Sequence, residues 1–304
     1  MVDVPESLRV RAEGRAGWDA WLADLPRLSD DLVADWQLRL DGPALAGSCA
    51  LVVPVRTDDD RPAVLKITWP HWEAETEHLA LRAWRGGGAV ELWRADPRRF
   101  ALLLERARPG ADLHDLDVRS ACEVVAGLYP RLHLAPLPQT RRLSELCRAW
   151  AERLARLAGS NLIARRFVGQ AERLLHDFAD DPSTDAVLIH TDLHYANVLA
   201  AKREPWLVID PKPLAGDPAY EVAPLLWNRW DEAMRAHAPR QALLDRVFAV
   251  VDAAGLEEDR VRDWIVVRAV CTIAELHRDH GPDRAPLLRD RVTVATAILK
   301  AVQR

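Results

Sequence analysis

The sequence has little of several features that would place a protein in a class at once. Its 304 residues include only four cysteines, without a Cys-x-x-Cys pair or the Cys/His spacing of a metal site. This excludes a disulfide framework, and we expect reduced, buried cysteines. No apolar run approaches the roughly 18 residues of a membrane-spanning helix, and the N-terminus lacks the apolar stretch of a signal peptide. We therefore expect a cytoplasmic protein without a membrane partner.

A basic excess is also missing, because the formal net charge is −5. Nucleic-acid binders usually present a basic surface to the phosphates, so we expect no nucleic-acid partner. A net acidic protein is better suited to a cationic partner. Lysine itself is scarce, with four lysines among 41 basic residues. A lysine inside an apolar strand of such a chain is therefore worth explaining.

The distribution of apolar residues predicts an α+β fold. The first 35 or so residues have the spacing of short helices, and a helix is predicted over 72–84, before three consecutive glycines. Strands are predicted over 36–40, 50–55, 63–68, 89–94 and 99–105, the second and third forming an antiparallel hairpin. Beyond Pro109-Gly110, helices are predicted over 117–134, 143–157 and 161–179, with a β-rich island over 186–210. We expect a small, sheet-rich N-terminal lobe (1–106) and a larger, helical C-terminal lobe (107–304).

The β-rich island contains the residues best suited to chemistry. An apolar strand leads to His190 and Asp192, Asn197 follows five residues later, and a second apolar strand ends in Asp210. Phosphoryl transfer from ATP needs a carboxylate near the attacking hydroxyl and oxygen ligands for Mg²⁺. The spacing His-x-Asp-x-x-x-x-Asn is that of the protein-kinase catalytic loop. Each residue alone could cap a turn or end a strand, but the ordered set favours phosphoryl transfer.

Two segments around this motif resemble the aminoglycoside/hydroxyurea phosphotransferases, nearest to their streptomycin-kinase branch. They are Ile189–Ala201 and Arg203–Glu221, with weaker similarity at Ala63–Ile67 and Ala101–Arg106. The resemblance implies a bilobal, protein-kinase-like fold that binds ATP in the cleft between its lobes, and GTP stays open as an alternative.

The same resemblance assigns roles to the residues of the motif. It implies that Asp192 is the catalytic base and that Asn197 and Asp210 are the Mg²⁺ ligands. His190 would hold the loop by hydrogen bonds, and His194 would be a structural neighbour. Asp210 is followed by Pro-Lys in place of Phe-Gly, so a flipping phenylalanine is not expected.

Lys66 is predicted to act on the nucleotide from the N-terminal lobe. A charge inside an apolar strand is costly unless it has a partner. In kinases such a lysine contacts the α- and β-phosphates and pairs with a glutamate of the next helix. Glu77 is the expected partner, and Glu73, one helical turn away, is the rival.

Two further segments are predicted to contact the nucleotide. The sequence lacks the Gly-x-Gly-x-x-Gly of protein kinases, but Gly47 and Ser48 could let backbone N–H groups approach a phosphate, with an ordinary turn as the alternative. The segment Leu103–Ala107 should be the hinge, where backbone groups of Glu105 and Ala107 would bind the base.

Carboxylates beside tryptophans follow Asp210. Most acidic residues on helices are simply solvated, and Asp217 is expected to brace a loop. A cationic acceptor would nevertheless need two or three carboxylates, which pair well with guanidinium groups. The candidates for this role are Glu221, Asp231, Glu232, Glu275 and Asp279.

Together these features predict a monomeric kinase that phosphorylates a hydroxyl of a streptomycin-like aminoglycoside and so confers antibiotic resistance. One alternative is a kinase of hydroxyurea or of another small hydroxylated metabolite. Another is a catalytically silent, kinase-like binding protein. The complete set of Lys66, Asp192, Asn197 and Asp210 disfavours this last interpretation.

Overall fold

The chain forms two compact units, which are described separately below. The computed structural model describes residues 2–13, 15–157, 162–279 and 285–303. The first unit contains Met1–Pro109 and Ala200–Lys212, and the second contains Gly110–Leu199 and Pro213–Arg304. The predicted boundary at residue 106 is close to the first crossing, but the prediction had assigned 200–212 to the second part of the chain.

The first unit is built on a six-stranded antiparallel sheet with strand order β1-β3-β4-β6-β5, in which β2 also pairs with β3. Its strands are β1 (Arg39–Leu40), β2 (Leu45–Ala46), β3 (Ala50–Arg56), β4 (Pro62–Thr68), β5 (Leu92–Asp96) and β6 (Ala101–Glu105). The predicted hairpin is confirmed, because β3 and β4 pair from Ala50–Thr68 to Arg56–Pro62. Alternate residues of β4, such as Leu65 and Ile67, are fully buried in the core.

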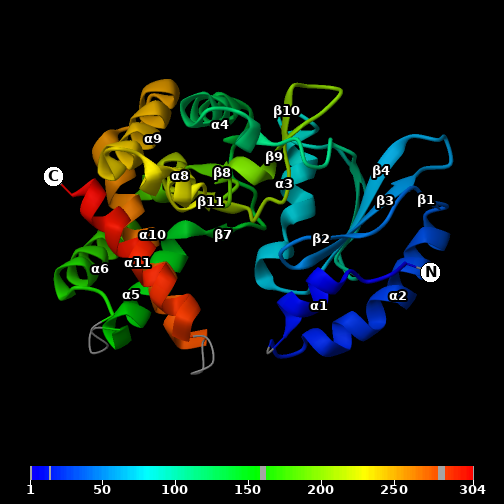
Figure 1. Cartoon of the computed structure of the whole chain (residues 1–304), viewed down its shortest axis with the longest axis horizontal. Coiled ribbons are helices and arrows are strands. Elements are labelled where there is room, and N and C mark those ends of the chain that lie inside the picture. Colours follow the sequence, from blue (N-terminus) through cyan, green and yellow to red (C-terminus); the bar gives the residue numbers. More distant parts are fainter. Residues whose placement is uncertain (1, 14, 158–161, 280–284, 304) are drawn as a thin grey trace. The chain divides into compact units, whose positions relative to one another are not determined.

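Two N-terminal helices pack on this sheet (Figure 1). They are α1 (Glu6–Ala12) and α2 (Trp18–Asp35), the second of which is much longer than the short helices predicted. Leu22, Leu25 and Leu32 lie one or two helical turns apart on α2 and are buried in the same core as the strands. The helices therefore complete the hydrophobic core of the first unit.

Three predicted elements differ from the observed ones. Trp36 caps the end of α2 and the next residue has φ 56°, so the predicted strand over 36–40 shortens to β1. The predicted helix over 72–84 divides into the 3₁₀ turn η1 (Trp72–Ala74) and α3 (Glu77–Trp84). Ala89, expected in a strand over 89–94, bridges Val208 instead, and β5 begins only at Leu92.

Contacts between residues far apart in the sequence explain why residues 200–212 belong to the first unit. Val208, in β10 (Trp206–Val208), accepts a hydrogen bond from Val90 N (3.0 Å) and donates one to Gly88 O (2.9 Å). Arg203 forms an ion pair with Glu105 (2.8 Å). Asp210 is thereby fixed in the same unit as Lys66.

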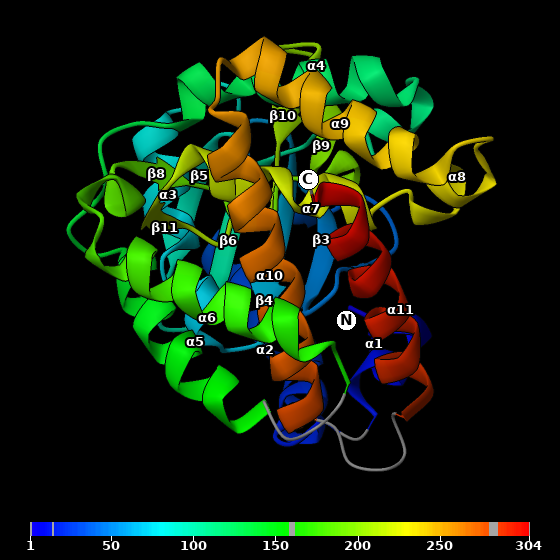
Figure 2. The ribbon, with the colours of Figure 1, turned by 90° about the vertical axis from the view of Figure 1, so that its left-hand side faces the viewer.

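The second unit is mainly helical. Its helices are α4 (Val118–Leu132), α5 (Leu143–Leu157), α6 (Arg165–Asp180), α7 (Pro224–Trp227), α8 (Trp230–Arg235), α9 (Pro239–Ala254), α10 (Glu258–Asp279) and α11 (Ala285–Val302). Helix α10 packs against α5, α6, α9 and α11 and runs through the middle of this group (Figure 2). The 3₁₀ turns η2 (Leu113–Asp115), η3 (Pro182–Asp185), η4 (Tyr195–Asn197) and η5 (Pro218–Val222) connect these elements. The start of the helix predicted over 161–179 lies outside the described residues.

A small sheet of the second unit supports the predicted catalytic loop. Its strand order is β7-β11-β8, and the strands are β7 (Arg141–Arg142), β11 (Leu214–Gly216) and β8 (Val187–Ile189). Strand β9 (Val198–Ala200) ends where the chain passes into the first unit. Three of the four free cysteines are buried, as predicted, and Cys49 is partly exposed. Across the described residues, no helix combines the length and apolar character that a bilayer span requires.

Candidate active site

In the first unit, one lysine is shared by two carboxylates. Lys66 lies on β4 and points to the face opposite Leu65 and Ile67, as the two-residue period of a strand dictates. Its ammonium is 2.6 Å from Glu77 Oε1 in the first turn of α3, and it also donates to Asp210 Oδ1. The side chains of Lys66 and Glu77 are almost fully buried. Glu73 lies instead near His71 (3.6 Å), so Glu77 is the partner of Lys66.

The electrostatics of this group follow from one cation facing two anions. Burial by itself would lower the pKa of Lys66, but the neighbouring carboxylates of Asp210 and Glu77 outweigh it and raise the pKa above its ordinary value. Burial raises the pKa of Glu77, and Lys66 only partly offsets this because the negative charge of Asp210 raises the pKa further. Lys66 is therefore a permanent cation held between two anionic partners.

Asp210 has an unusual backbone conformation. Its φ is 57°, in the left-handed region that few residues other than glycine adopt, although aspartate tolerates it better than most. Its side chain is about one-third exposed, in contrast to those of Lys66 and Glu77. One carboxylate of the group therefore reaches solvent, where a metal ion could meet it.

The two segments of the first unit that are predicted to bind the nucleotide each contain a backbone hydrogen bond. Gly47 and Ser48 lie in the tight turn between β2 and β3, where Gly47 N donates to Ala50 O (2.8 Å). A Cβ at Gly47 would lie only 3.3 Å from Ala50 O, so glycine suits this turn. At the predicted hinge, Glu105 N donates to Glu91 O (2.9 Å), so a base could use only the carbonyl of Glu105. Ala107 follows it and is buried.

In the second unit, the predicted catalytic loop follows β8. Asp192 lies after His190 and Thr191, and its side chain is about one-quarter exposed. Asn197 ends the turn η4 and donates from Nδ2 to Asp192 O (2.8 Å). This bond fixes the orientation of the amide, and it turns Oδ1 away from the Asp192 carbonyl. His190 is fully buried and accepts from Asp192 N (3.3 Å), which agrees with the structural role predicted for it.

Glu221 holds the backbone of this loop through hydrogen bonds. It is fully buried, and Oε1 accepts from the backbone N–H groups of Thr191 (2.8 Å) and His190. His133 Nε2 lies 2.8 Å from Oε2. Burial would raise the pKa of Glu221, but His133 and the backbone donors outweigh it and lower the pKa. The prediction that Glu221 binds the acceptor is wrong, because the carboxylate has no exposed surface and both oxygens are engaged.

The turn after β11 braces the same sheet. Asp217 is buried and accepts from Ala219 N (2.9 Å), Trp264 Nε1 (2.7 Å) and Arg260. A Cβ at Gly216 would lie 2.2 Å from Ile189 Cδ1, so only glycine lets β11 approach β8 this closely. Asp217 therefore has the bracing contacts that its sequence position suggested.

The remaining acceptor candidates differ in their availability. Asp231, on α8, has a mostly exposed side chain, with Arg235 at 3.8 Å. Glu232 is paired with Arg229 (2.7 Å), whose guanidinium lies over the Tyr195 ring of the catalytic loop. Glu275 accepts from Trp150 Nε1 (2.8 Å) and is partly exposed. The side chain of Asp279 lies outside the described residues.

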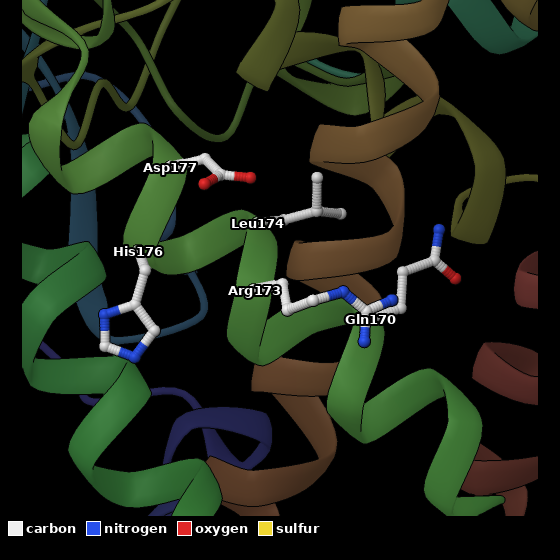
Figure 3. Close-up of a pocket in the computed structure, with 5 residues that line it drawn as sticks. All are labelled: Gln170, Arg173, Leu174, His176 and Asp177. Atoms are coloured by element: carbon white, nitrogen blue, oxygen red, sulfur yellow. The ribbon is translucent and has the colours of Figure 1, made fainter.

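A surface pocket of about 390 Å³ is found elsewhere in the second unit. It is lined by the α6 residues Gln170, Arg173, Leu174, His176 and Asp177 (Figure 3). Asp177 and Leu174 point toward α10, whereas His176 points away from them. None of these residues was predicted as a site residue.

Comparison with known proteins identifies the family. The sequence model of the aminoglycoside/hydroxyurea antibiotic resistance kinases matches residues 35–281. The chain belongs to this family. A streptomycin 6-kinase of Streptomyces glaucescens is 37% identical over 87% of this kinase and 87% of its own length. A hydroxyurea phosphotransferase of Kitasatospora aureofaciens is 38% identical over 89% of this kinase and 79% of its own length.

Solved structures agree on the fold. The crystal structure of a thermostable mutant of aminoglycoside phosphotransferase APH(4)-Ia, in ternary complex with ADP and hygromycin B, aligns with a TM-score of 0.59. It covers 90% of this kinase and 97% of its own chain at 17% identity. The predicted α+β, protein-kinase-like fold is therefore confirmed.

Sequence reasoning missed the role of Glu221 in this kinase, as well as its partner His133. Glu221 ends the segment Arg203–Glu221 that resembles the family, but nothing in this segment distinguishes a buried brace from a substrate ligand. His133 is 88 positions away in the sequence and carries no motif of its own.

Proposed function

We propose that this kinase transfers the γ-phosphate of ATP to a hydroxyl of a streptomycin-like aminoglycoside and so confers resistance to it. The observation that carries the proposal is the buried Lys66–Glu77 pair with Asp210, since phosphoryl transfer uses such a lysine and such an aspartate together. The 37% identity to a streptomycin 6-kinase supports the choice of acceptor. Because ATP is supplied in the cytoplasm, the reaction would take place there.

In the proposed reaction, the oxygen of the acceptor hydroxyl forms a bond to the γ-phosphorus, and Asp192 accepts the proton of that hydroxyl. The bond from the γ-phosphorus to the bridging oxygen breaks, and ADP leaves. Lys66, a permanent cation, would hold the α- and β-phosphates from β4. The turn at Gly47–Ser48 would contribute backbone N–H groups, and the hinge near Glu105 and Ala107 would bind the base.

The residues proposed as Mg²⁺ ligands fit this ion by their chemistry. Asn197 offers an amide oxygen of fixed orientation, and Asp210 offers a partly exposed carboxylate. Both are hard oxygen donors, and one or two protein ligands suffice where phosphates supply the others. When bound, Mg²⁺ neutralises the charge that develops on the transferred phosphoryl group.

For the acceptor, we propose that Asp231, Glu232 and Glu275 form the pool from which its cationic groups are bound. Asp231 and Glu275 are exposed enough to reach a ligand. Glu232 would have to share its charge with Arg229. Glu275 is already oriented by Trp150, so less ordering entropy would be lost when it binds a guanidinium.

The test is direct phosphorylation. Purified protein with ATP and Mg²⁺ is incubated with streptomycin, other aminoglycosides and hydroxyurea, and mass spectrometry follows the gain of one phosphate. A sensitive bacterium that expresses the gene should grow on streptomycin. If no aminoglycoside gains a phosphate and no protection is seen, the proposal is refuted.

A second candidate acceptor is hydroxyurea, because a hydroxyurea phosphotransferase is 38% identical to this chain. The two candidates differ in charge. Neutralising Asp231 or Glu275 should raise KM for a cationic aminoglycoside but leave KM for neutral hydroxyurea unchanged. Phosphorylation of hydroxyurea alone would favour the second candidate.

A further inference from the structure

The first helix of the chain reaches the turn that we propose for phosphate binding. Arg11, in the last turn of α1, donates from its guanidinium to Gly47 O and lies 3.5 Å from Ala46 O. Gly47 lies in the turn between β2 and β3, and Ala46 is the last residue of β2. An exposed arginine thus bonds to main-chain carbonyls 35 and 36 positions further along the chain.

The direction of this hydrogen bond matters because a trans peptide unit has its C=O and N–H antiparallel. When Arg11 binds Gly47 O, the N–H of Ser48, in the same peptide unit, must point to the opposite side. An N–H oriented in this way can donate to an anion on the side away from α1. Arg11 therefore sets the orientation of the peptide that would meet a phosphate.

The other end of the turn is held by Trp69, which follows β4 and packs against helix α2. Cys49 O accepts from Trp69 N (2.8 Å). The Trp69 ring stacks on Trp18, in the first turn of α2, with centroids 5.3 Å apart and planes 23° apart. Trp18 is buried in the core of the first unit. The turn is thus fixed at both ends by contacts that lead to α1 or α2.

We propose that α1 and the start of α2 position the Gly47–Ser48 turn for nucleotide phosphates, with Arg11 as the positioning residue. The inference rests on the proposed function, since it assumes that this turn meets a nucleotide. The turn lacks the repeated glycines of a protein-kinase loop, so an external support replaces what the loop sequence does not supply. Helix α1 and the start of α2 precede residue 35, where the family match begins, so the match does not include this support.

The experiment compares nucleotides that have phosphates with one that has none. Affinities for MgATP, MgADP and adenosine are measured by calorimetry for the wild type, Arg11→Ala and Arg11→Lys. Arg9→Ala is the matched control, because Arg9 is an exposed arginine of the same helical turn. Loss of the hydrogen bond in Arg11→Ala should lower the affinity for MgATP and MgADP about five- to tenfold, and the affinity for adenosine should stay unchanged. Arg11→Lys, which keeps a donor, should weaken them about two- to threefold.

A purely structural role would predict another pattern. If Arg11→Ala weakens adenosine as much as MgATP, or if Arg9→Ala has the same effect as Arg11→Ala, the inference is overturned. It is also overturned if both Arg11 variants bind MgATP like the wild type. If the wild type binds neither MgATP nor adenosine, the proposed function fails first. Should Arg11→Ala not fold, the comparison between Arg11→Lys and Arg9→Ala decides.

Discussion

At the scale of single residues, the predicted catalytic base and the aspartate predicted as a Mg²⁺ ligand both lie at or beside a left-handed backbone position. Thr191, just before Asp192, has φ 67°, and Asp210 itself has φ 57°. For a β-branched residue this conformation is strained and persists only when the surroundings fix it. At Thr191, Glu221 supplies this restraint by accepting from two successive N–H groups. The strain and its restraint together determine where Asp192 is presented.

Replacing Asp192 should remove turnover without removing nucleotide binding. A positioned base typically contributes roughly 10²- to 10⁴-fold to rate, so Asp192→Asn should lower kcat by that factor. The Kd for MgATP, measured by calorimetry, should stay within about twofold, because the proposed base serves the acceptor. Asp252→Asn, at an exposed position of α9, is the control and should keep full activity. More than half of the wild-type kcat in Asp192→Asn would exclude this role.

The restraint by Glu221 should be visible in the pH dependence of stability. Its pKa is lowered in the folded protein, so its stabilising effect is complete above the ordinary pKa of about 4.3 and is lost as the pH falls through the lower, folded value. Glu221→Gln should lower the free energy of unfolding at about pH 7 by about 1–3 kcal/mol. Urea titrations at about pH 7 and about pH 3.5 should show this difference narrowing in acid. A difference that is independent of pH would contradict the assignment.

At the scale of elements, the close approach of β11 to β8 determines how the catalytic loop leaves its strand. β8 ends at Ile189, one residue before the loop, and Ile189 packs directly against Gly216. A side chain on β11 would force Ile189 to move within a closely packed core. The small sheet therefore sets the position from which the loop starts.

Gly216→Ala should accordingly destabilise the second unit by about 1–3 kcal/mol and lower kcat as well. Adding Ile189→Ala, which removes the two Ile189 atoms that would lie closer than 3 Å to the new methyl group, should restore part of the activity. Gly127→Ala is the matched control. A Cβ there would have no neighbour within 4 Å on helix α4, so this change should be neutral or slightly stabilising. Thermal unfolding and kcat for the wild type and these three variants decide, and equal effects of the two glycine changes would be evidence against a steric role.

Elements governed by local patterns were predictable, and those governed by distant contacts were not. The β3–β4 hairpin followed from two apolar strands around a polar turn, and the pairing of Lys66 with a glutamate of α3 followed from the cost of a buried charge and the lysine–glutamate pair of kinases. The strand predicted over 89–94 was misplaced because its first residues pair with β10, more than 100 positions away. Glu221 was misassigned for the same reason, since its role depends on two N–H groups 30 and 31 residues earlier.

At the scale of the whole molecule, the net charge of −5 should assist the arrival of a polycationic acceptor. kcat/KM for streptomycin should therefore fall as salt rises from about 50 to about 300 mM, because the Debye length shortens to below about 10 Å. KM for MgATP at saturating acceptor serves as the reference. For a neutral acceptor such as hydroxyurea, kcat/KM should hardly respond to salt. A streptomycin reaction that is insensitive to salt would argue against electrostatic recognition.

The path of the chain also limits how such a kinase can recombine with a relative. The chain passes between its two units after Pro109, after Leu199 and after Lys212, and Asp210 is carried by the short middle segment. A chimera with a single crossover near residue 109 would inherit Lys66 and Glu77 from one parent but Asp210 and Arg203 from the other. To take Lys66, Glu77 and Asp210 from the same parent, a chimera must change parent after Pro109, after Leu199 and after Lys212. Shuffled genes that preserve activity should therefore carry residues 200–212 together with residues 1–109.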